Sequence, residues 1–328
     1  MRRMVWVVLA VFVVMAGFAF TGTAADAYPS SEIKHILPWS AGGGTDTVMR
    51  AFMNQLEEYA GVSIYTVNIS GANSGQGVSE LMASRPDGYT IGTLTYDSII
   101  TVPYFGLLEG YSMDRLAFVG LVTDHPTVIA VHQDSPYETI ADLVKAAEEK
   151  PGTVGISNVG LGGVWHLPAV DFEQQAGVTF NHVAFPGGSG EQREALLKKE
   201  VEVACISVGG IFPALRAGRA RILAVMSEER MEEYPEVPTF RELGYDVIWG
   251  SMRVLAVPKD TPEERVAILE EACEKTAHDE DWKAWLDETG GGGWTWRNSQ
   301  DTTEYVYNLQ DRVFSLLDDL VEMGIVEK

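Results

Sequence analysis

The chain has 328 residues, with 24 Lys and Arg against 47 Asp and Glu, so its formal net charge at pH 7 is −23. Tracking nucleic acid or coating an anionic membrane needs clustered positive charge, so both functions are disfavoured. The apolar fraction of 46% is that of a globular protein with a core and argues against disorder. Glycine, at 33 residues, exceeds its usual share of about 7%, so the positions of the glycines are informative.

The N-terminus has the pattern of an export signal. Arg2 and Arg3 precede an apolar run from Met4 to Phe20, and small residues then lead to Ala25-Asp26-Ala27. This order predicts a cleaved signal peptide over residues 1–27 and a periplasmic or otherwise extracytoplasmic protein. The apolar run is at the lower length limit for spanning a bilayer, so an uncleaved N-terminal anchor is the alternative. No second long apolar segment follows, and we expect no membrane insertion of the mature chain.

Apolar β-branched runs alternate with stretches of helical period along the mature chain, which predicts βα units. Helices are predicted at Thr45 to Tyr59 and Thr139 to Glu149, and a helical stripe of apolar residues continues through 301–328. Between Thr289 and this stripe, Gly290 to Gly293 predict a turn. The predicted strands are Ile33 to Pro38, Ser63 to Val67, Thr90 to Thr95, Thr127 to Val131, Val154 to Ser157, Val201 to Ser207, Ala220 to Val225 and Val254 to Val257.

The fold class predicted from this alternation is α/β. About 300 mature residues exceed the usual size of one core, so we expect two lobes, each a mostly parallel sheet flanked by helices. Without a Pro-rich or Ser-rich linker, the chain should cross between lobes through strands near residues 123–128 and 247–253. The predicted division is 28–125 plus 250–328 for lobe 1 and 126–249 for lobe 2. The cysteines, Cys205 and Cys273, have no spacing that supports a disulfide, so two buried thiols are expected.

Four glycine-rich loops each lie between a predicted strand and a predicted helix. Glycine lets the backbone approach a ligand closely, and the first helical turn presents free N–H groups and the positive end of the helix dipole. Each loop alone is explained by an ordinary tight turn, but four of them suggest a cleft that binds a small carboxylate through backbone donors. The loops are Ser40 to Asp46, Ser70 to Gly77, Ser157 to Gly163 and Pro186 to Gly190.

Other chemistries fit the sequence poorly. None of the loops has the Lys of a phosphate-binding Walker motif, and Gly160-Leu161-Gly162 lacks the third glycine of a dinucleotide site. The histidines show no metal-binding spacing, so we expect neither metal nor cofactor. Ser189 lacks the flanking glycine pattern of a nucleophile elbow, which leaves a secreted hydrolase as a weak alternative.

Short motifs in a fixed order extend over the whole mature chain. They are Tyr28-Pro29, Gly42-Gly43-Gly44-Thr45-Asp46 with Arg50, Pro86-Asp87-Gly88-Tyr89-Thr90, Pro151-Gly152, the Ser157 to Leu167 segment, Leu215-Arg216-Ala217-Gly218, Pro235-Glu236-Val237-Pro238-Thr239 and Val257-Pro258. In this order they closely resemble the Bug family, the periplasmic solute-binding proteins of tripartite tricarboxylate transporters. The resemblance implies a type II-like periplasmic-binding-protein fold that closes on a mono-, di- or tricarboxylate. It also implies a monomer that delivers the ligand to a permease of one large and one small subunit.

The resemblance also implies the ligand-binding residues, partly acting through ordered water. In lobe 1 they are Ser40, Gly43, Gly44, Thr45, Asp46, Ala72, Ser74, Thr95 and Ser98, and in lobe 2 they are Ser157, Asn158, Gly160, Gly163, His166 and Gly188. Two of these residues have an alternative role: Asp46 as a helix cap and His166 as a packed core histidine.

The sequence departs from the family pattern at three places. Cys205, Ile206 and Ser207 stand where many relatives have an Asp, and Pro-Gly-Gly-Ser after Phe185 replaces a common Lys-Gly pair, so a positive group near the ligand is missing. Trp165 replaces a small residue and is expected to narrow the cleft or to stack on a ring. Besides transport, a ligand sensor for a membrane histidine kinase fits the same features.

Overall fold

A computed structural model of the chain describes residues 28–42, 44–160, 162–185, 188–289, 294–324 and 326. The predicted signal peptide at 1–27, the predicted site residue Gly43 and the predicted turn at 290–293 lie outside the described residues. Among the helices that are described, none combines the length and the apolar character needed to cross a membrane.

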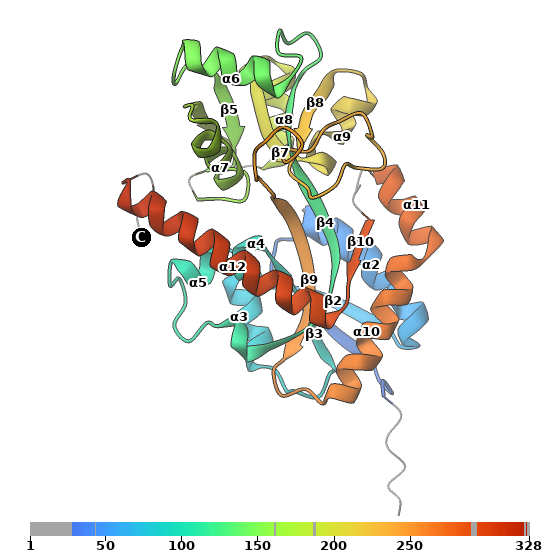
Figure 1. Ribbon diagram of the computed structural model, residues 1–328. Helices are drawn as coiled ribbons and strands as arrows, with labels where there is room; N and C mark the ends of the chain where they lie inside the picture. Colours follow the sequence, from blue (N-terminus) through green and yellow to red (C-terminus); the bar gives the residue numbers. More distant parts are fainter. Residues whose placement is uncertain are drawn as a thin grey trace, which may run out of the picture.

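The first part of the chain forms three parallel strands in the order β2-β1-β3. As predicted, each apolar strand leads into a helix, and the helices cover the sheet (Figure 1). On α2, Phe52 is fully buried and its ring meets that of Trp282 edge-on at 5.1 Å. The elements are β1 (Ile33–Leu37), α2 (Gly44–Ala60), β2 (Ile64–Asn68), α3 (Gly75–Ala83), β3 (Thr90–Thr95), α4 (Tyr96–Ile99), α5 (Thr101–Tyr104) and the 3-10 helix η1 (Met113–Arg115).

Two long antiparallel strands, β4 (Leu116–His132) and β9 (Gly250–Pro258), run through the middle of the molecule (Figure 1). The sequence predicted strands over nearly all of β9 and in β4 from about residue 123, but not at 116–122. The part of β4 that was not predicted contains Gly120, a residue that is unfavourable in a central strand. Pro126 is tolerated because it pairs with Gly250 at the end of the ladder between β4 and β9.

A second group of elements lies beyond these strands, in the upper part of Figure 1. Its strands follow the order β4-β7-β5-β6, and β8 also pairs with β4. β6 was not predicted, because its four residues are half polar and lie at the edge of the sheet. The elements are α6 (Ile140–Glu149), β5 (Gly155–Asn158), α7 (Leu167–Ala176), β6 (Asn181–Ala184), α8 (Ser189–Leu197), β7 (Val203–Ser207), α9 (Val208–Arg216) and β8 (Ala220–Val225).

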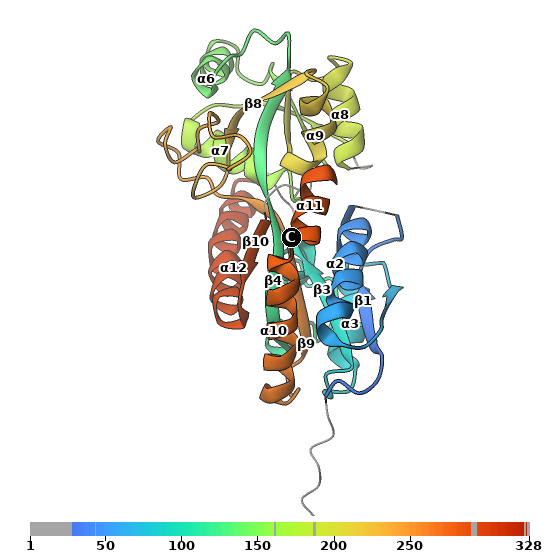
Figure 2. The ribbon, with the colours of Figure 1, turned by 90° about the vertical axis from the view of Figure 1, so that its right-hand side faces the viewer.

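After β9 the chain adds one more strand and three helices to the first group. The new strand β10 pairs with β4, and the predicted apolar stripe lies on one long helix, with Val306, Val313 and Leu317 fully buried. Figure 2 shows this helix on one side of the long strands and α10 and α11 nearer the other. The elements are α10 (Glu263–His278), α11 (Glu280–Thr289), β10 (Trp294–Arg297) and α12 (Ser299–Glu322).

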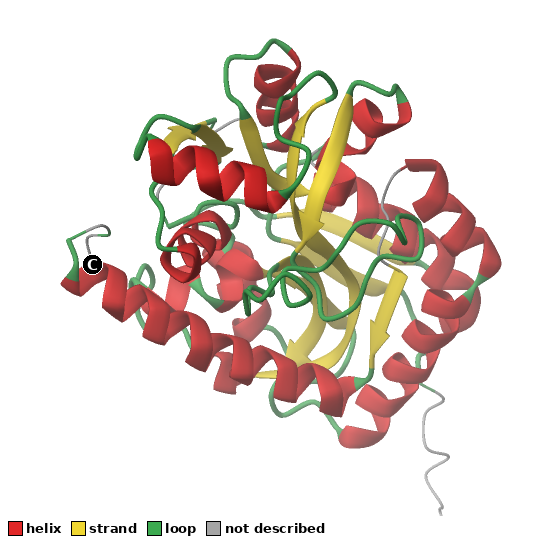
Figure 3. Cartoon of the chain, turned by 45° about the horizontal axis from the view of Figure 1, so that its top comes forward, coloured by secondary structure: helices red, strands yellow, loops and turns green. Residues whose placement is uncertain are grey.

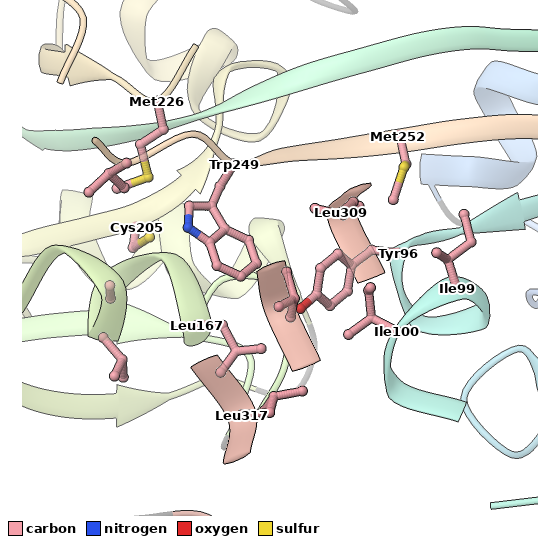
Figure 4. Close-up of a cluster of buried hydrophobic side chains, with 14 of the residues drawn as sticks. Tyr96, Ile99, Ile100, Leu167, Cys205, Met226, Trp249, Met252, Leu309 and Leu317 are labelled. Carbon is pink, nitrogen blue, oxygen red and sulfur yellow. The ribbon is translucent and has the colours of Figure 1, made fainter. Parts of the chain in front are cut away.

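The α/β class is confirmed, and the strands lie inside a shell of helices (Figure 3). Parallel pairs occupy the outer strands, whereas every pair that involves β4 or β9 is antiparallel. One apolar cluster joins both groups of elements: the ring of Tyr96 on α4 lies 5.9 Å from that of Trp249, with Leu309 of α12 beside them (Figure 4). Cys205 and Cys273 are both buried free thiols, as expected.

Candidate functional site

A cavity of about 920 Å³ lies where the two groups of elements meet. Its wall is assembled from the ends of strands and the starts of helices in both groups, together with the end of α11. The lining residues are Trp39, Ser40, Gly42, Gly44, Thr45, Thr47, Val48, Thr95, Tyr96, Asp97, His125, Val164, Trp165, Ser189, Ser207, Gly209, Gly210, Ser251, Arg253, Trp285 and Thr289.

Polar side chains on three adjacent strands form one side of this central cavity. Arg253 on β9 lies opposite Thr95 on β3 and opposite Thr123 on β4, and Ser251 lies opposite His125. Residues two apart on a strand share a face, and directly opposed residues have their Cβ atoms about 5 Å apart. The sheet register therefore gathers these five polar side chains into one patch. All but the fully buried Thr123 line the cavity.

Arg253 is the cation of this patch. The residue is only 7% exposed, and its guanidinium donates to Thr123 Oγ1 at 3.3 Å and to the carbonyl of Ser251 at 3.1 Å. Burial lowers the pKa of Arg253 to about 10, and the charge of Asp124 opposes that shift. Its Nε has no hydrogen-bond partner in the part of the chain that the structure describes. A buried donor without a partner is costly, so Arg253 is suited to bind an anion.

His125 contributes a second buried polar atom without a hydrogen-bond partner. The side chain is 5% exposed, and its Nε2 has no partner within the described ranges. Burial, followed by the positive charge of Arg253, lowers the pKa of His125 well below its ordinary value. The ring is therefore neutral at physiological pH and offers one nitrogen to a ligand.

Besides the short helix α4, three longer helices start at the cavity wall. Gly44 and Thr45 begin α2, Ser189 begins α8, and Gly209 and Gly210 lie in the first turn of α9. The free N–H groups and the dipole at each helix start favour an anion. Together with Arg253, they make the cavity electrostatically suited to a carboxylate in spite of the overall acidic charge.

Ser40, Gly44, Thr45 and Thr95 are the sequence-predicted site residues that line the cavity. Thr95 Oγ1 accepts a hydrogen bond from Trp39 Nε1 at 3.1 Å, which holds both side chains at the wall.

Asp46 instead bonds within the protein. Its carboxylate accepts from the backbone N–H of Gly42 at 2.9 Å, from Asn68 Nδ2 at 2.8 Å and from Arg50 Nε at 2.9 Å. Burial alone would raise the pKa of Asp46, but these hydrogen bonds and the charge of Arg50 lower it. The carboxylate thus fixes the first glycine loop against β2, which is close to the capping role considered as its alternative.

Ala72, Ser74 and Ser98 lie behind the wall, not on it. Ser74 is 1% exposed, and its Oγ lies 2.9 Å from Ser98 Oγ. Ser98 Oγ in turn accepts from the backbone N–H of Thr95 at 3.1 Å. Ala72 to Ser74 have positive φ angles, which turn the loop tightly. These residues support Thr95 from behind.

In the second group of elements, the residues that line the cavity are sequence neighbours of the predicted site residues. Val164 and Trp165 line it beside Gly163 and His166, and Ser189 lines it beside Gly188. Trp165 is 5% exposed and lines the cavity. Ser157, Asn158, Gly160, Gly163, His166 and Gly188 are not among the lining residues.

Asn158 and His166, at the third glycine loop, form hydrogen bonds within the second group of elements. Asn158 Oδ1 accepts from the N–H of Gly160 at 2.8 Å, and His166 Nδ1 accepts from the N–H of Gly162 at 3.1 Å. Burial, and then the neighbouring His182, lower the pKa of His166 to about 4. This arrangement is the packed histidine considered as the alternative. Ser157 Oγ is buried with no partner among the described residues.

Arg253 is not among the site residues that the sequence predicts. The sequence suggested that a positive group near the ligand was missing, whereas the structure supplies one from β9, far along the chain from the loop at Phe185. One signal was available: Arg253 is the only charge between Asp246 and Lys259, in an otherwise uncharged strand. The lining contributions of Trp285 and Thr289 on α11 had no comparable signal.

Comparisons with known proteins agree with this architecture. Residues 48–321 match the family model described as the tripartite tricarboxylate transporter family receptor. The chain is 27% identical over 266 residues to Protein BugT of Bordetella pertussis, covering 80% of this chain and 81% of that protein.

Two solved structures are similar over most of this chain. A TctC solute-binding protein from Polaromonas, solved without ligand, is 29% identical with a TM-score of 0.80, covering 89% of this chain and 100% of that one. A protein of R. palustris solved with adipate is 25% identical with a TM-score of 0.74, covering 89% and 97%. Within the described residues, no group of three or more His, Cys, Asp or Glu is placed to hold a metal ion. The chain belongs to the tripartite tricarboxylate transporter receptor family, whose members are periplasmic solute-binding proteins and not enzymes.

Proposed function

We propose that this chain captures a small mono-, di- or tricarboxylate in the central cavity and delivers it to the permease of a tripartite tricarboxylate transporter. The permease has one large and one small membrane subunit, as the family resemblance implies. The chain reaches its compartment through the signal peptide at 1–27 and works there as a monomer.

The observation that carries this proposal is the state of Arg253. Arg253 is 7% exposed, its Nε has no partner among the described residues, and it lines a cavity faced by the starts of α2, α8 and α9. A carboxylate accepts two hydrogen bonds from a guanidinium fork and neutralises its buried charge. The R. palustris protein solved with adipate, a dicarboxylate, supports the same ligand class.

The proposed mechanism is closure of two lobes about β4 and β9. Lobe 1 comprises 28–125 plus 250–328 and lobe 2 comprises 126–249, so the boundaries fall in the pair formed by Pro126 and Gly250. Lobe 1 supplies Arg253 and the start of α2, and lobe 2 supplies the starts of α8 and α9. Ligand bound to one lobe gains hydrogen bonds from the other, and the closed form presents the surface that the permease recognises.

A ligand screen tests the receptor function. Protein purified after export, unfolded to release any carried ligand and refolded, is titrated calorimetrically with a panel of mono-, di- and tricarboxylates, sugars and cations. We expect at least one carboxylate to bind and to raise the melting temperature. Strong binding of a sugar or a cation without any carboxylate would contradict the proposal. Mass spectrometry of the exported protein should give an N-terminus at Tyr28, whereas an intact Met1 would support the anchor alternative.

Delivery is tested separately in cells. Uptake of the labelled carboxylate that binds best should be lost when either this chain or the permease is deleted. Uptake that is unchanged after deletion of this chain would contradict a transport role and favour sensing.

A further inference from the structure

One acidic residue lines the central cavity. Asp97, in the first turn of α4, lines it together with Thr95 and Tyr96. Its Oδ1 accepts a hydrogen bond from Thr101 Oγ1 at 3.2 Å, and no Lys, Arg or His within the described ranges forms an ion pair with it. A carboxylate at this place is unexpected if the ligand is a simple polyanion, because like charges repel.

Asp97 and Arg253 do not neutralise each other. Burial raises the pKa of Asp97 to about 6, hydrogen bonds oppose that shift, and the charge of Arg253 is not among its causes. Conversely, the acid that acts on the pKa of Arg253 is Asp124. The two opposite charges therefore face one cavity without pairing, and closure around a ligand would bury both.

The cavity that Asp97 lines also has aromatic residues in its wall. Trp39, Tyr96, Trp165 and Trp285 line the same cavity from four different segments. Aromatic faces attract cations, and Trp does so most strongly. Acidic and aromatic groups together suit an ammonium or a methylated ammonium group, and they offer little to a second carboxylate.

We propose, on the basis of the receptor function above, that the ligand is a zwitterion whose carboxylate binds Arg253 and whose cationic nitrogen binds Asp97 between the aromatic walls. Such a ligand pairs both buried charges and leaves the closed cavity neutral. A dicarboxylate with ionised Asp97 would instead leave it with a net charge of −2, which is costly in a site shielded from water.

The competing hypothesis is that Asp97 is protonated and donates a hydrogen bond to the second carboxylate of a dicarboxylate ligand. The two assignments differ in the sign of their pH dependence, because only one needs Asp97 ionised. Asp97 is the lining group that titrates between pH 5 and 8: the pKa of His125 is lowered well below this range, that of Tyr96 is raised well above it, and that of Arg253 is about 10.

The experiment compares ligands of matched shape by calorimetry at pH 7.5 and pH 5. One set is 4-aminobutyrate, pentanoate and glutarate, which have similar lengths and a cationic, neutral or anionic distal end. The other pair is trimethylglycine and its carbon analogue 3,3-dimethylbutanoate. The variants are Asp97→Asn and, as an exposed acidic control outside the cavity, Asp260→Asn.

We expect at least one zwitterion to bind about ten- to a hundredfold more tightly than its matched analogues at pH 7.5, the range for a charged hydrogen bond. That preference should shrink as the pH falls through about 6 and should disappear in Asp97→Asn, while Asp260→Asn retains it. If Asp97→Asn does not unfold cooperatively, Asp97→Ser and the pH series on the unaltered protein serve as the test.

Two results overturn the inference. Glutarate binding that is equal to or tighter than that of the zwitterions and rises toward pH 5 would assign a protonated Asp97 to a dicarboxylate. Zwitterion binding that is unchanged in Asp97→Asn would show that Asp97 does not bind the cationic nitrogen. Both leave the carboxylate receptor intact, whereas failure of every carboxylate in the panel to bind would contradict the proposed function itself.

Discussion

Arg253 on β9 lies directly opposite Thr95 on β3, so the buried cation of the cavity is fixed by the antiparallel pairing of two strands that are far apart in sequence. Thr95 also caps the start of α4, and it is bonded to Trp39 in front and to Ser98 behind. The guanidinium is therefore held by a rigid sheet, and its position does not depend on a mobile loop. A ligand that binds Arg253 pays little to order it.

The first prediction concerns Arg253 itself. Arg253→Gln should weaken binding of the best carboxylate about a hundredfold, because the charge and the unpartnered Nε are both lost. Arg253→Lys should weaken it about tenfold, because the charge stays but the planar fork is lost. Calorimetric titration of each variant measures the change.

Arg216→Gln is the matched control for Arg253. Arg216 is exposed on α9 and does not line the cavity, so this change should alter affinity less than twofold. Equal affinities of Arg253→Gln and Arg216→Gln, with both proteins folded, would exclude Arg253 as the anion-binding group.

The second prediction tests whether Ser98 stabilises the protein behind the cavity wall or contacts the ligand directly. Ser98→Ala removes a fully buried hydroxyl and leaves the Thr95 N–H and the Ser74 hydroxyl short of a partner. We expect the free energy of unfolding in urea to fall by about 1–3 kcal/mol. Ser84→Ala, which removes a solvent-exposed hydrogen bond to the carbonyl of Glu80, should cost under about 0.5 kcal/mol. A large loss of ligand affinity in Ser98→Ala without loss of stability would instead indicate the direct contact that the family resemblance implied.

Much of the fold follows from local sequence patterns, because apolar β-branched runs and amphipathic stretches are read within a window of a few residues. β1 and α2 were predicted nearly to their ends in this way. Elements specified by tertiary pairing were not predicted. The first half of β4 contains Gly120, and its strand structure depends on pairing with β9 and β10. Local pattern could not show that pairing.

The same division applies to the site. The glycine loop at Ser40 to Thr45 was located from sequence because glycines and hydroxyls at a helix start have a local signature. Arg253 and Trp285 reach the cavity through sheet register and helix packing, which no local motif records. Ser74 and Ser98 look like ligand donors in sequence because a buried hydroxyl network uses the same residue types.

The third prediction tests the tight packing of the second glycine loop. A Cβ at Gly77 would lie 2.6 Å from the carbonyl oxygen of Ile69 and 2.9 Å from Pro38 Cα, both of them backbone atoms. Gly77→Ala should therefore destabilise the protein by about 1–3 kcal/mol, although Ala is normally the better helix residue. The control Gly190→Ala, also in the first turn of a helix but with open space around its Cβ, should be neutral or stabilising by up to about 1 kcal/mol. Urea unfolding of both variants measures the difference, and equal effects would contradict the close packing at Gly77.

The fourth prediction is a pH-dependent gain in stability for ligand-free Asp97→Asn. Burial raises the pKa of Asp97 from 3.8 to about 6, so the folded state holds a proton that the unfolded chain releases at lower pH. The unaltered protein should then lose stability relative to Asp97→Asn as the pH rises from about 4 to about 6, and the difference should stay constant above that. Since Asp97 is partly exposed to the cavity, we expect a plateau of about 1–3 kcal/mol. Urea unfolding at pH 4, 5, 6 and 7.5 without ligand measures it, with Asp260→Asn as the control that should show no such trend. A stability difference that is constant from pH 4 to 7.5 would mean that Asp97 has an ordinary pKa, and binding of a cationic group could then not be explained by relief of a buried, unpaired carboxylate.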